Sequence, residues 1–294
     1  MELKGIDISS WQEGFKIVNA INNGYSYAIL RAGFTGTKDG INKNKDSQFE
    51  NFYKQAKDLN FPVGAYWYSC ANTYEKGKAE AEYMYENCLK GKQFEYPIYL
   101  DVEESQYQAG KWQGVTDAIK GFCETLENLG YFVGIYASLS RFGSWFDGDL
   151  PYTKWIACWS SYKPSTNLPY FDMWQNSSKN YIYDYRVDTD FVYRDFPTII
   201  KNGGFNGYKK PEPTPTPEPT PEPTPEPQPE PEKIKVGDWV YPIEMVDYYG
   251  TPVVAWDDKY KVTELVGDRA VLKAKRNGKF VTWAAMNVNN LKKV

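Results

Sequence analysis

The chain has 294 residues and a formal net charge of −4, and it contains no histidine. The missing imidazole excludes Ser-His-Asp and Cys-His nucleophile sites and zinc sites built on histidine, so proton transfer in any hydrolysis falls to carboxylates, lysine, tyrosine or water. A sequence pI of about 5.2 argues against nucleic acid as a partner, because such a partner selects a basic surface. Aromatic residues make up 17% of the chain, a surplus that fills a core or stacks on ligands such as saccharides.

The sequence also bears on location and covalent cross-links. It has no run of 18 apolar residues, so we expect no membrane insertion. Its first residues include no apolar signal-peptide stretch, which predicts a product made without a visible export signal. The four cysteines are too scattered for a disulfide framework and lack a metal-binding spacing. We predict free, buried thiols at Cys70, Cys88, Cys123 and Cys158.

A proline-rich segment divides the chain. From residue 211 to residue 231 every second residue is proline, interleaved with Thr, Glu and one Gln. Proline fixes φ and removes a backbone donor, so the segment predicts an extended polyproline II spacer on the order of 65 Å long. A spacer between two modules fits this position better than a ligand segment for SH3 domains. The predicted domains are a large one over residues 1–208, a linker over 209–232 and a small module over 233–294.

In chain order, the large domain first alternates strand and helix patterns. Short runs rich in β-branched and aromatic residues predict strands, and segments with helical periodicity lie between them. The predicted strands are residues 3–9, 27–34, 62–69, 96–103 and 131–138, and the clearest helices are 46–60, 74–89 and 112–129.

The pattern changes after residue 140. Three further strand-like runs, at 154–159, 170–175 and 187–192, are joined by connections with little helical character. Five βα units followed by three strands predict an α/β fold, an irregular TIM-like (β/α)5(β)3 barrel of parallel strands. In such a barrel the working residues lie at the carboxyl ends of the strands.

Two carboxylates lie at the carboxyl end of the fourth predicted strand. Asp101 and Glu103 are two residues apart, so both project to one face of an otherwise apolar strand. Buried carboxylates are costly, and two close ones raise each other's pKa, so that one is protonated as an acid while its neighbour stays ionised. Glycosidic bond cleavage needs one protonated and one ionised carboxyl. Taken alone, the pair also fits a Ca²⁺ or Mg²⁺ site or a salt-bridge network.

More acids fall on the first and last strands. Asp7 lies on the first strand, and Asp188 and Asp190 lie on the last. These two strands are neighbours in a closed barrel, so their acids would converge on one mouth with the acids of the fourth strand. Arg31 lies in an apolar second strand, where a lone charge needs a carboxylate partner. Five acids and one arginine at strand ends favour catalysis over the metal and salt-bridge interpretations.

These residues lie in segments that resemble the family 25 glycoside hydrolases, N-acetylmuramidases (lysozymes) of phage endolysins and bacterial autolysins. The resemblance implies an irregular β/α barrel that cuts the β-1,4 bond between N-acetylmuramic acid and N-acetylglucosamine in bacterial peptidoglycan, with no cofactor and no metal. It covers essentially all of residues 1–200. The matching segments are residues 5–12 (GIDISSWQ), 28–32 (AILRA), 63–66 (VGAY), 99–103 (YLDVE), 134–136 (GIY), 174–175 (WQ) and 187–188 (VD).

The resemblance also implies roles for the acids. Glu103 matches the proton donor of the family. Asp101 matches the carboxylate that stabilises the transition state, either directly or through the acetamido group of the substrate. Asp7 and Asp188 match acids that flank the substrate, which completes the predicted catalytic set.

Two positions depart from the family pattern, and several aromatic residues complete the predicted site. Trp67 stands where the family often has histidine, and Asp190 stands where asparagine is common. Aromatic side chains near strand ends are suited to stacking on sugar rings, although we expect roughly half of them to fill the core only. The predicted substrate-binding residues are Arg31, Tyr66, Trp67, Tyr136, Trp159, Trp174 and Asp190.

The C-terminal module is basic and rich in predicted strands. It has 11 basic and 7 acidic residues, a net charge of +4, which suits an anionic polymer but also ordinary solubility. Runs at 238–243, 259–266, 269–275 and 279–285 predict a small all-β barrel. Residues 267–272 (GDRAVL) and 282–285 (TWAA) resemble bacterial SH3-like cell-wall-binding modules, which implies tethering of the enzyme to its polymer. We predict ligand contacts at Trp256 and Trp283.

Two other functions stay open on the sequence. A chitinase-like barrel also uses carboxylates on its fourth strand, although the Asp-Gly-x-Asp-x-Asp-x-Glu pattern is absent. A non-catalytic wall lectin needs the aromatic residues but not the acids. We expect bacterial peptidoglycan as the partner and a monomer or weak homo-oligomer. We also expect a phage endolysin that accumulates in the host cytoplasm and then reaches the cell wall, or an enzyme exported by a non-classical route.

Overall fold

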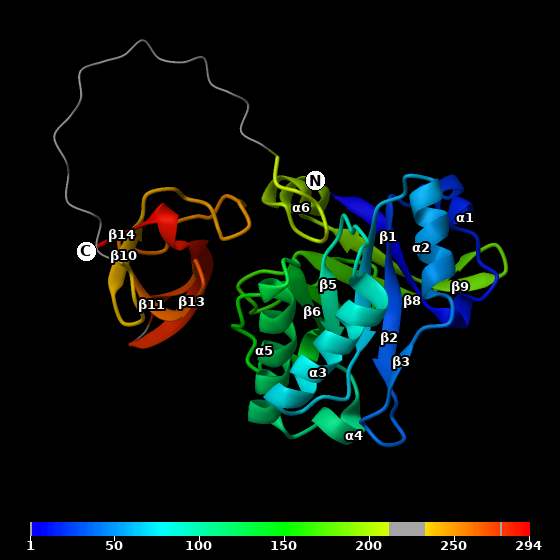
Figure 1. The fold of residues 1–294 in the computed structure, drawn as a ribbon, viewed down its shortest axis with the longest axis horizontal. Helices are drawn as coiled ribbons and strands as arrows, with labels where there is room; N and C mark the ends of the chain where they lie inside the picture. Colours follow the sequence, from blue (N-terminus) through cyan, green and yellow to red (C-terminus); the bar gives the residue numbers. More distant parts are fainter. Residues whose placement is uncertain (1, 212–232, 277) are drawn as a thin grey trace, which may run out of the picture. The chain divides into compact units, whose positions relative to one another are not determined.

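The computed structural model describes residues 2–211, 233–276 and 278–294. The chain forms two compact units, Met1–Lys209 and Lys210–Val294, which are described separately (Figure 1). Most of the predicted linker, residues 212–232, lies outside the described residues. Among the described residues, no helix has the length and apolar character needed to cross a membrane.

The first unit is a closed eight-stranded barrel. Its hydrogen-bonded order is β1-β2-β4-β5-β6-β7-β8-β9, and β9 pairs back with β1. The short β3 adds to the free end of β2 as a hairpin. The strands are β1 (Leu3–Ile8), β2 (Tyr27–Thr35), β3 (Lys43–Lys45), β4 (Val63–Tyr68), β5 (Ile98–Asp101), β6 (Val133–Ser138), β7 (Thr153–Ala157), β8 (Met173–Ile182) and β9 (Tyr185–Val192).

All eight predicted strands are present, but the last one runs in the unexpected direction. Strands β1, β2 and β4 to β8 are mutually parallel, whereas β9 is antiparallel to both β8 and β1. The expectation of a fully parallel barrel is therefore wrong at β9. The physical reason is the short connection: β8 and β9 are joined by a two-residue turn with Tyr183 at φ 52°, which allows only a hairpin.

Helices cover the outside of the barrel. In Figure 1, α2, α3 and α5 lie along the parallel strands, and helical structure is sparse between β6 and β9, as predicted. Helices α3 and α5 pack closely because both carry glycine at the contact: a Cβ at Gly77 would overlap the backbone of Ala118. The helices are α1 (Ile17–Asn22), α2 (Phe49–Asp58), α3 (Tyr74–Met84) with a π-helical end (Tyr85–Leu89), α4 (Ser105–Gln108), α5 (Trp112–Asn128) and α6 (Phe196–Gly203).

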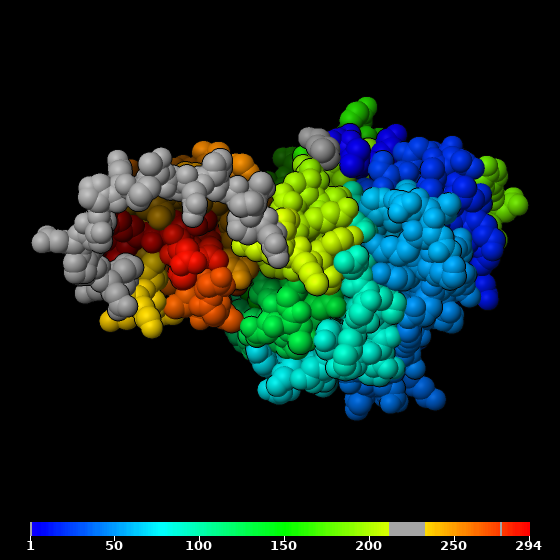
Figure 2. Space-filling view, turned by 45° about the horizontal axis from the view of Figure 1, so that its top comes forward, coloured from blue at the N-terminus to red at the C-terminus, as the bar shows by residue number. Residues whose placement is uncertain are grey.

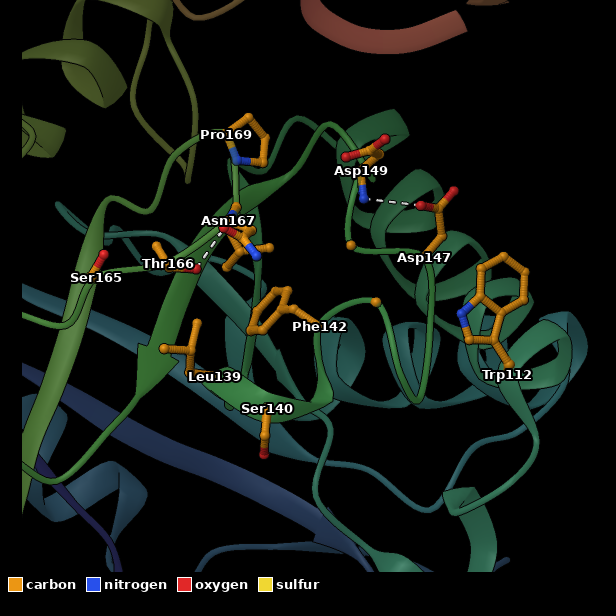
Figure 3. Close-up of a pocket in the computed structure, with 13 residues that line it drawn as sticks. Trp112, Leu139, Ser140, Phe142, Asp147, Asp149, Ser165, Thr166, Asn167 and Pro169 are labelled. Carbon is orange, nitrogen blue, oxygen red and sulfur yellow. Dashed lines mark hydrogen bonds between the residues drawn. The ribbon is translucent and has the colours of Figure 1, made fainter. Parts of the chain in front are cut away.

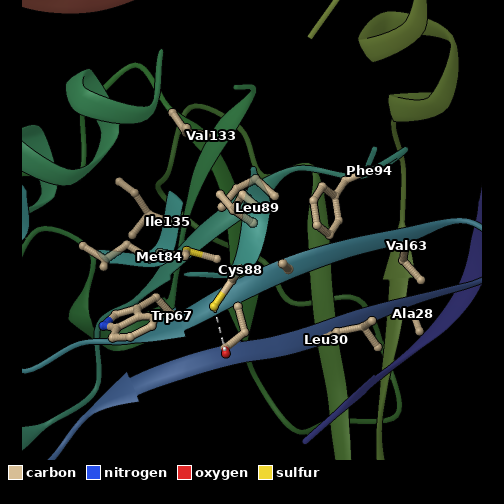
Figure 4. Close-up of a cluster of buried hydrophobic side chains, with 14 of the residues drawn as sticks. Ala28, Leu30, Val63, Trp67, Met84, Cys88, Leu89, Phe94, Val133 and Ile135 are labelled. Carbon is tan, nitrogen blue, oxygen red and sulfur yellow. Dashed lines mark hydrogen bonds between the residues drawn. The ribbon is translucent and has the colours of Figure 1, made fainter. Parts of the chain in front are cut away.

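The main hydrophobic core lies between the barrel and these helices. Outward-facing strand residues such as Leu30, Val63 and Ile135 pack with Met84 and Leu89 at the end of α3 (Figure 4). Alternation along each strand sends every second side chain into this layer. The four cysteines are free thiols, and three of them are buried as predicted, whereas Cys158 is only half-buried.

The inside of the barrel is filled by aromatic side chains, and glycine residues make room for them. A Cβ at Gly5 would overlap the ring of Tyr27, and one at Gly134 would overlap the ring of Tyr99. Trp155 is also buried, with its ring centroid 5.2 Å from that of Tyr99. Part of the aromatic surplus in the sequence therefore forms a packed floor inside the barrel.

The end of the barrel that carries the amino ends of the parallel strands is covered. The Asn206 side chain accepts a hydrogen bond from Phe132 N at 2.8 Å and donates one to Tyr96 O at 2.9 Å, just before β6 and β5. Figure 2 shows the last part of the first unit, near residue 200 and coloured yellow-green, packed against the blue and cyan parts of the unit. The carboxyl ends of the parallel strands form the opposite end, called the mouth below.

The second unit contains a five-stranded antiparallel sheet in the order β13-β12-β11-β10-β14. Its core includes Val240, Tyr260, Leu272 and Met286. The four predicted strands are present; β14 was not predicted because three residues are too few to show an alternating pattern. The strands are β10 (Trp239–Pro242), β11 (Tyr260–Val266), β12 (Arg269–Arg276), β13 (Lys279–Asn287) and β14 (Leu291–Lys293), with a 3-10 turn (Val288–Asn290) before β14.

Of the two tryptophans predicted to contact a ligand in this unit, one is exposed and one is not. The ring of Trp283 stacks on that of Tyr260 with centroids 3.8 Å apart, and its Nε1 donates to Val254 O at 2.9 Å. Trp283 is buried in the core, so its prediction as a ligand contact is wrong: it lies on the inner face of the sheet. Trp256 lies in the loop before β11 and is exposed, with the Arg276 guanidinium 5.9 Å from its ring.

Candidate active site

Three of the predicted acids meet where the first and last strands of the barrel pair. Asp7 on β1 is directly opposite Asp188 on β9, and Gly5 is opposite Asp190. Because β9 is antiparallel, Asp190 lies one step deeper in the barrel than Asp188. A parallel β9 would have placed Asp190 nearer the mouth.

Gln175 on β8 connects these acids. Its Nε2 donates to Asp7 Oδ2 at 2.9 Å and to Asp188 Oδ2 at 3.4 Å. Its Oε1 accepts hydrogen bonds from Tyr136 OH at 2.9 Å and from Trp159 Nε1 at 3.0 Å. The amide therefore holds two carboxylates and two aromatic side chains in one arrangement. Gln175 was not predicted as a site residue. The available signals were its place in one of the matching segments and its position next to the apolar Trp174, which indicates that the two side chains face opposite sides of the strand.

Trp155 on β7 forms the floor beneath the acids. Its Nε1 donates to Asp190 Oδ1 at 2.8 Å. Its ring lies 4.4 Å from that of Tyr136 and 6.1 Å from that of Tyr66, centroid to centroid. Trp155 was not predicted as a site residue, because an aromatic side chain in a predicted strand gives no sign of which face it occupies.

Asp101 and Glu103 differ in how accessible they are. Asp101 ends β5 and is 3% exposed, and its Oδ1 is buried without a hydrogen bond to any described residue. Glu103 lies two residues beyond the strand, and its side chain is 36% exposed. Arg141, which was not predicted, places Nη1 3.9 Å from Glu103 Oε2 and donates to Val102 O at 3.3 Å. A substrate at the mouth can therefore touch Glu103 first, with Asp101 beneath it.

Burial raises the pKa values of both the Asp101 and the Glu103 carboxyls. Burial raises the pKa of Asp101 well above its usual value, Glu103 raises it further, and Arg141 and Arg31 oppose the shift. Burial also raises the pKa of Glu103, against the attraction of Arg141. The pair therefore keeps a proton at pH values where a free carboxyl is ionised.

The acids at the β1–β9 pairing are shifted in the same direction. Burial raises the pKa of Asp188 to about 6, against the attraction of Arg186. Burial raises the pKa of Asp7 well above its usual value, and the nearby Asp190 and Asp188 raise it further. Each of these carboxyls is thus biased toward its neutral form. A positive charge or hydrogen-bond donors of a bound ligand would favour the ionised form.

Arg31 and Tyr66 lie on neighbouring strands at the mouth. Arg31 has the carboxylate partner that its place in an apolar strand requires: its Nε is 2.7 Å from Asp46 Oδ2, and its Nη2 donates to Ser10 Oγ at 2.8 Å. This partner lies outside the group of five acids. Burial raises the pKa of the Tyr66 phenol well above its usual value, and Asp7 adds to the shift. Tyr66 is therefore close to the acids.

Two predicted substrate-binding residues face away from the mouth. Trp67 is fully buried among the outward-facing core residues, and its Nε1 donates to Thr35 Oγ1 at 3.2 Å (Figure 4). Trp174 is also buried, and its Nε1 donates to Cys158 O at 2.7 Å. Strand alternation explains both errors, since each tryptophan is next to a residue that faces inward. The prediction of sugar contacts at Trp67 and Trp174 is wrong.

Two grooves lie among the loops of the first unit. The first, of about 520 Å³, runs from Trp159 along β8 and is lined by small polar residues. Trp159 is 64% exposed, so its ring is available beside the mouth. The second, of about 660 Å³, has Trp112 at one edge and Asp147 and Asp149 beside it (Figure 3). Within the described parts of the chain, no three Cys, Asp or Glu side chains are arranged as metal ligands.

Comparisons of sequence show relatives of the barrel unit. The family model for glycosyl hydrolases family 25 matches residues 6–185, more than half of the chain. The autolytic lysozyme of Clostridium acetobutylicum is 27% identical over 173 residues, which cover 57% of this chain and 48% of the relative. The match thus spans about half the length of that curated relative.

Solved structures share the fold. The CTP1L endolysin has a TM-score of 0.58 at 24% identity, over 68% of this chain and 70% of that one. The autolysin LytC of Streptococcus pneumoniae, in complex with a synthetic peptidoglycan ligand, has a TM-score of 0.57 at 23% identity, over 65% and 47%. A family 25 glycosyl hydrolase of Bacillus anthracis has a TM-score of 0.56 at 22% identity, over 70% and 93%. With its barrel and this family match, the chain belongs to glycosyl hydrolase family 25.

Proposed function

We propose that the barrel unit is a lysozyme of the endolysin or autolysin type. It hydrolyses the β-1,4 bond between N-acetylmuramic acid and N-acetylglucosamine in bacterial peptidoglycan. The observation that carries this proposal is the pair at the end of β5, in which an accessible carboxyl, Glu103, lies above a buried one, Asp101. The membership of family 25 and the printed functions of its relatives, an autolytic lysozyme and an autolysin with a peptidoglycan ligand, support the choice of substrate.

Glu103 acts as the general acid. Burial raises its pKa, which favours the protonated carboxyl, and its exposure lets the proton reach the glycosidic oxygen. As the bond to the leaving oxygen breaks, that oxygen takes the proton of Glu103. Arg141, 3.9 Å away, stabilises the carboxylate that remains.

Asp101 acts through the acetamido group of the substrate. Its buried Oδ1, which accepts no hydrogen bond from any described residue, is a ready acceptor for the acetamido N–H. That hydrogen bond favours ionised Asp101, so the proton shared by the pair moves to Glu103, where the reaction needs it. The acetamido oxygen then bonds to the anomeric carbon as the leaving oxygen departs. In the second step water attacks that carbon, the bond to the acetamido oxygen breaks and restores the acetamido group, and the proton of the water returns to Glu103, with net retention.

The remaining acids and aromatic residues hold the sugars. Asp7 and Asp188, tied together by Gln175, are placed to accept hydrogen bonds from sugar hydroxyls. The exposed ring of Trp159 and the half-buried ring of Tyr66 offer faces for stacking on pyranose rings.

The second unit serves as a wall-binding module of the SH3-like type. Its five short antiparallel strands, the 3-10 turn before the last strand and the long loop between β10 and β11 support this assignment. A tethered module of this kind raises the concentration of the enzyme at its polymer without new contacts in the active site.

The proposal is tested by giving the full chain purified peptidoglycan in one reaction and chitin in another. New reducing ends should appear on peptidoglycan at a rate at least about tenfold above that on chitin, since even a small difference in the contacts of a substrate group changes the rate by about tenfold or more. Faster release from chitin would favour the chitinase-like alternative. Binding to peptidoglycan with no new reducing ends in either reaction would favour a lectin.

A further inference from the structure

The sheet of the second unit has an outer face that combines lysines with aromatic rings. Trp239 on β10 is opposite Lys261 on β11, and Lys261 is opposite Lys273 on β12. Further along β12, Lys275 is opposite Phe280 on β13. The residues beside them on the same strands are buried in the core, among them Val240, Tyr260, Leu272 and Ala274. Because side chains alternate along a strand, the five residues named above point outward. We call them the basic-aromatic face: Trp239, Lys261, Lys273, Lys275 and Phe280.

Cation–π contacts hold the rings and ammonium groups of this face together. Lys261 Nζ is 5.4 Å from the centroid of Phe280, and Lys259 Nζ, at the edge of the face, is 5.5 Å from that of Trp239. The two ring centroids are 6.0 Å apart. Phe280 is 42% exposed, so part of its ring is available to a partner.

The arrangement of charge on this face is unfavourable for the isolated module. Lys261 and Lys273 are directly opposite each other on adjacent strands, and like charges in such a pair destabilise a sheet. Among the described residues, neither forms an ion pair, whereas Arg276 pairs with Asp257 and Lys293 with Asp238 elsewhere in the unit. The fold gives no reason for this concentration of unpaired lysines, and an anionic partner would provide one.

We propose that the basic-aromatic face binds the phosphodiester backbone of an anionic wall polymer, a chain of polyol phosphates. Neighbouring strands lie about 4.8 Å apart, and residues two apart on one strand lie about 7 Å apart, so one polymer chain can meet several of the lysines. Lysine ammoniums bind phosphate oxygens through charge-assisted hydrogen bonds, and the two rings offer apolar surface to the polyol carbons. The inference extends the proposed wall attachment and rests on it, because the activity of the barrel unit is what favours a wall polymer over nucleic acid.

The test uses the full chain and Gram-positive cell walls, either intact or stripped of phosphodiester polymer by hydrofluoric acid. The variant Lys261→Gln/Lys273→Gln removes two charges from the face, and Lys233→Gln/Lys235→Gln removes two exposed charges outside it. We expect the wild-type chain and the Lys233/Lys235 variant to bind intact walls about tenfold more tightly than stripped walls, and the Lys261/Lys273 variant to lose this preference. A soluble glycerol phosphate polymer should displace the wild-type chain, and should do so less well as salt is raised.

Several results would overturn the proposal. Equal binding of the wild-type chain to intact and stripped walls would do so, as would equal losses in the two double variants. Stronger competition by duplex DNA than by glycerol phosphate polymer at equal phosphate would assign the face to nucleic acid. If the Lys261/Lys273 variant does not fold, two other measurements decide. Phe280→Ala should weaken binding to intact walls, and glycerol phosphate polymer should displace the wild-type chain; failure of both would overturn the proposal. Release of reducing ends from stripped walls by the wild-type chain tests the proposed lysozyme activity separately.

Discussion

At the scale of single residues, the carboxyls of the mouth are sorted by accessibility. Glu103 is exposed enough to reach a glycosidic oxygen, whereas Asp101 is buried beneath it. The same burial that raises their pKa values makes each of them costly to the fold, and perturbed carboxyls of this kind are typical of catalytic sites, in agreement with the proposed role.

Replacing Glu103 with Gln should abolish turnover while leaving the fold intact. The amide cannot donate the proton, and loss of a general acid costs about 100-fold or more in rate. The measurement is the release of reducing ends from peptidoglycan, with the melting temperature followed in parallel. Glu104→Gln is the matched control, because Glu104 is the adjacent carboxylate and accepts from Tyr68 OH instead. Near-normal activity of the Glu103 variant would refute its role.

Replacing Asp188 with Asn should stabilise the protein at neutral pH but not at acidic pH. Burial raises the pKa of folded Asp188 from 3.8 to about 6, so the wild-type chain loses stability as the pH rises through this window. The asparagine variant lacks that loss. We expect a gain of about 1 kcal/mol at pH 7.5, allowing for partial exposure, and none below pH 3.8. Urea unfolding at the two pH values measures it; an equal difference at both would contradict the assigned shift.

The positions of the acids could be predicted from the sequence, but those of the residues that contact and orient them could not. Asp7, Asp101, Glu103 and Asp188 could be assigned to one mouth because strand alternation and barrel closure bring strand ends together. Gln175 and Arg141 could not, since their contacts depend on the paths of loops and on neighbouring strands that leave no pattern in the chain.

At the scale of elements, the direction of β9 determines the depth of the acids. Its hairpin with β8 puts Asp188 level with Asp7 and sends Asp190 down to the nitrogen of Trp155. The eight strands could be predicted from apolar runs, whereas this direction could not, because the short turn lies in a segment without a glycine-based turn signal. The apolar runs also hide which face each residue takes, so Trp67 was assigned to the mouth although it packs against the helices.

Gly5 is the position at which the inside of the barrel is most sensitive to added volume. In Gly5→Ala the new Cβ would overlap the Tyr27 ring, which is fully buried and stacked on Tyr96 with centroids 4.3 Å apart. We expect a loss of about 2–3 kcal/mol in the free energy of unfolding. Gly36→Ala is the control, because the nearest atom to its Cβ lies 3.5 Å away. Equal losses in urea unfolding of the two variants would show that the Tyr27 contact does not matter.

At the scale of the whole molecule, the chain has two units with separate cores, and we assign catalysis to the first and attachment to the second only as proposals. The core of the first unit includes Ile6 and Trp67, and that of the second includes Tyr260 and Trp283. The proline-rich segment marks the division in the sequence, because a composition in which every second residue is proline excludes a shared sheet or helix.

A chain that ends at residue 209 should keep its activity on purified peptidoglycan and lose activity on whole cells. The active-site contacts described above lie within residues 1–209. Loss of the tethered module lowers the effective concentration at the wall, so lysis of intact cells should fall about tenfold or more. Both rates are measured against the full chain. Loss of activity on purified peptidoglycan as well would show that the units depend on each other.

The central claim is that the Glu103–Asp101 pair hydrolyses the glycosidic bond of N-acetylmuramic acid, so that this sugar carries the new reducing end. Its most direct test is to digest purified peptidoglycan, reduce the new ends with borohydride and identify the reduced sugar. Reduced N-acetylmuramic acid at the new ends, absent from the digest with Glu103→Gln, is the result that we expect. Reduced N-acetylglucosamine at those ends, or the same ends from the variant, would contradict the claim.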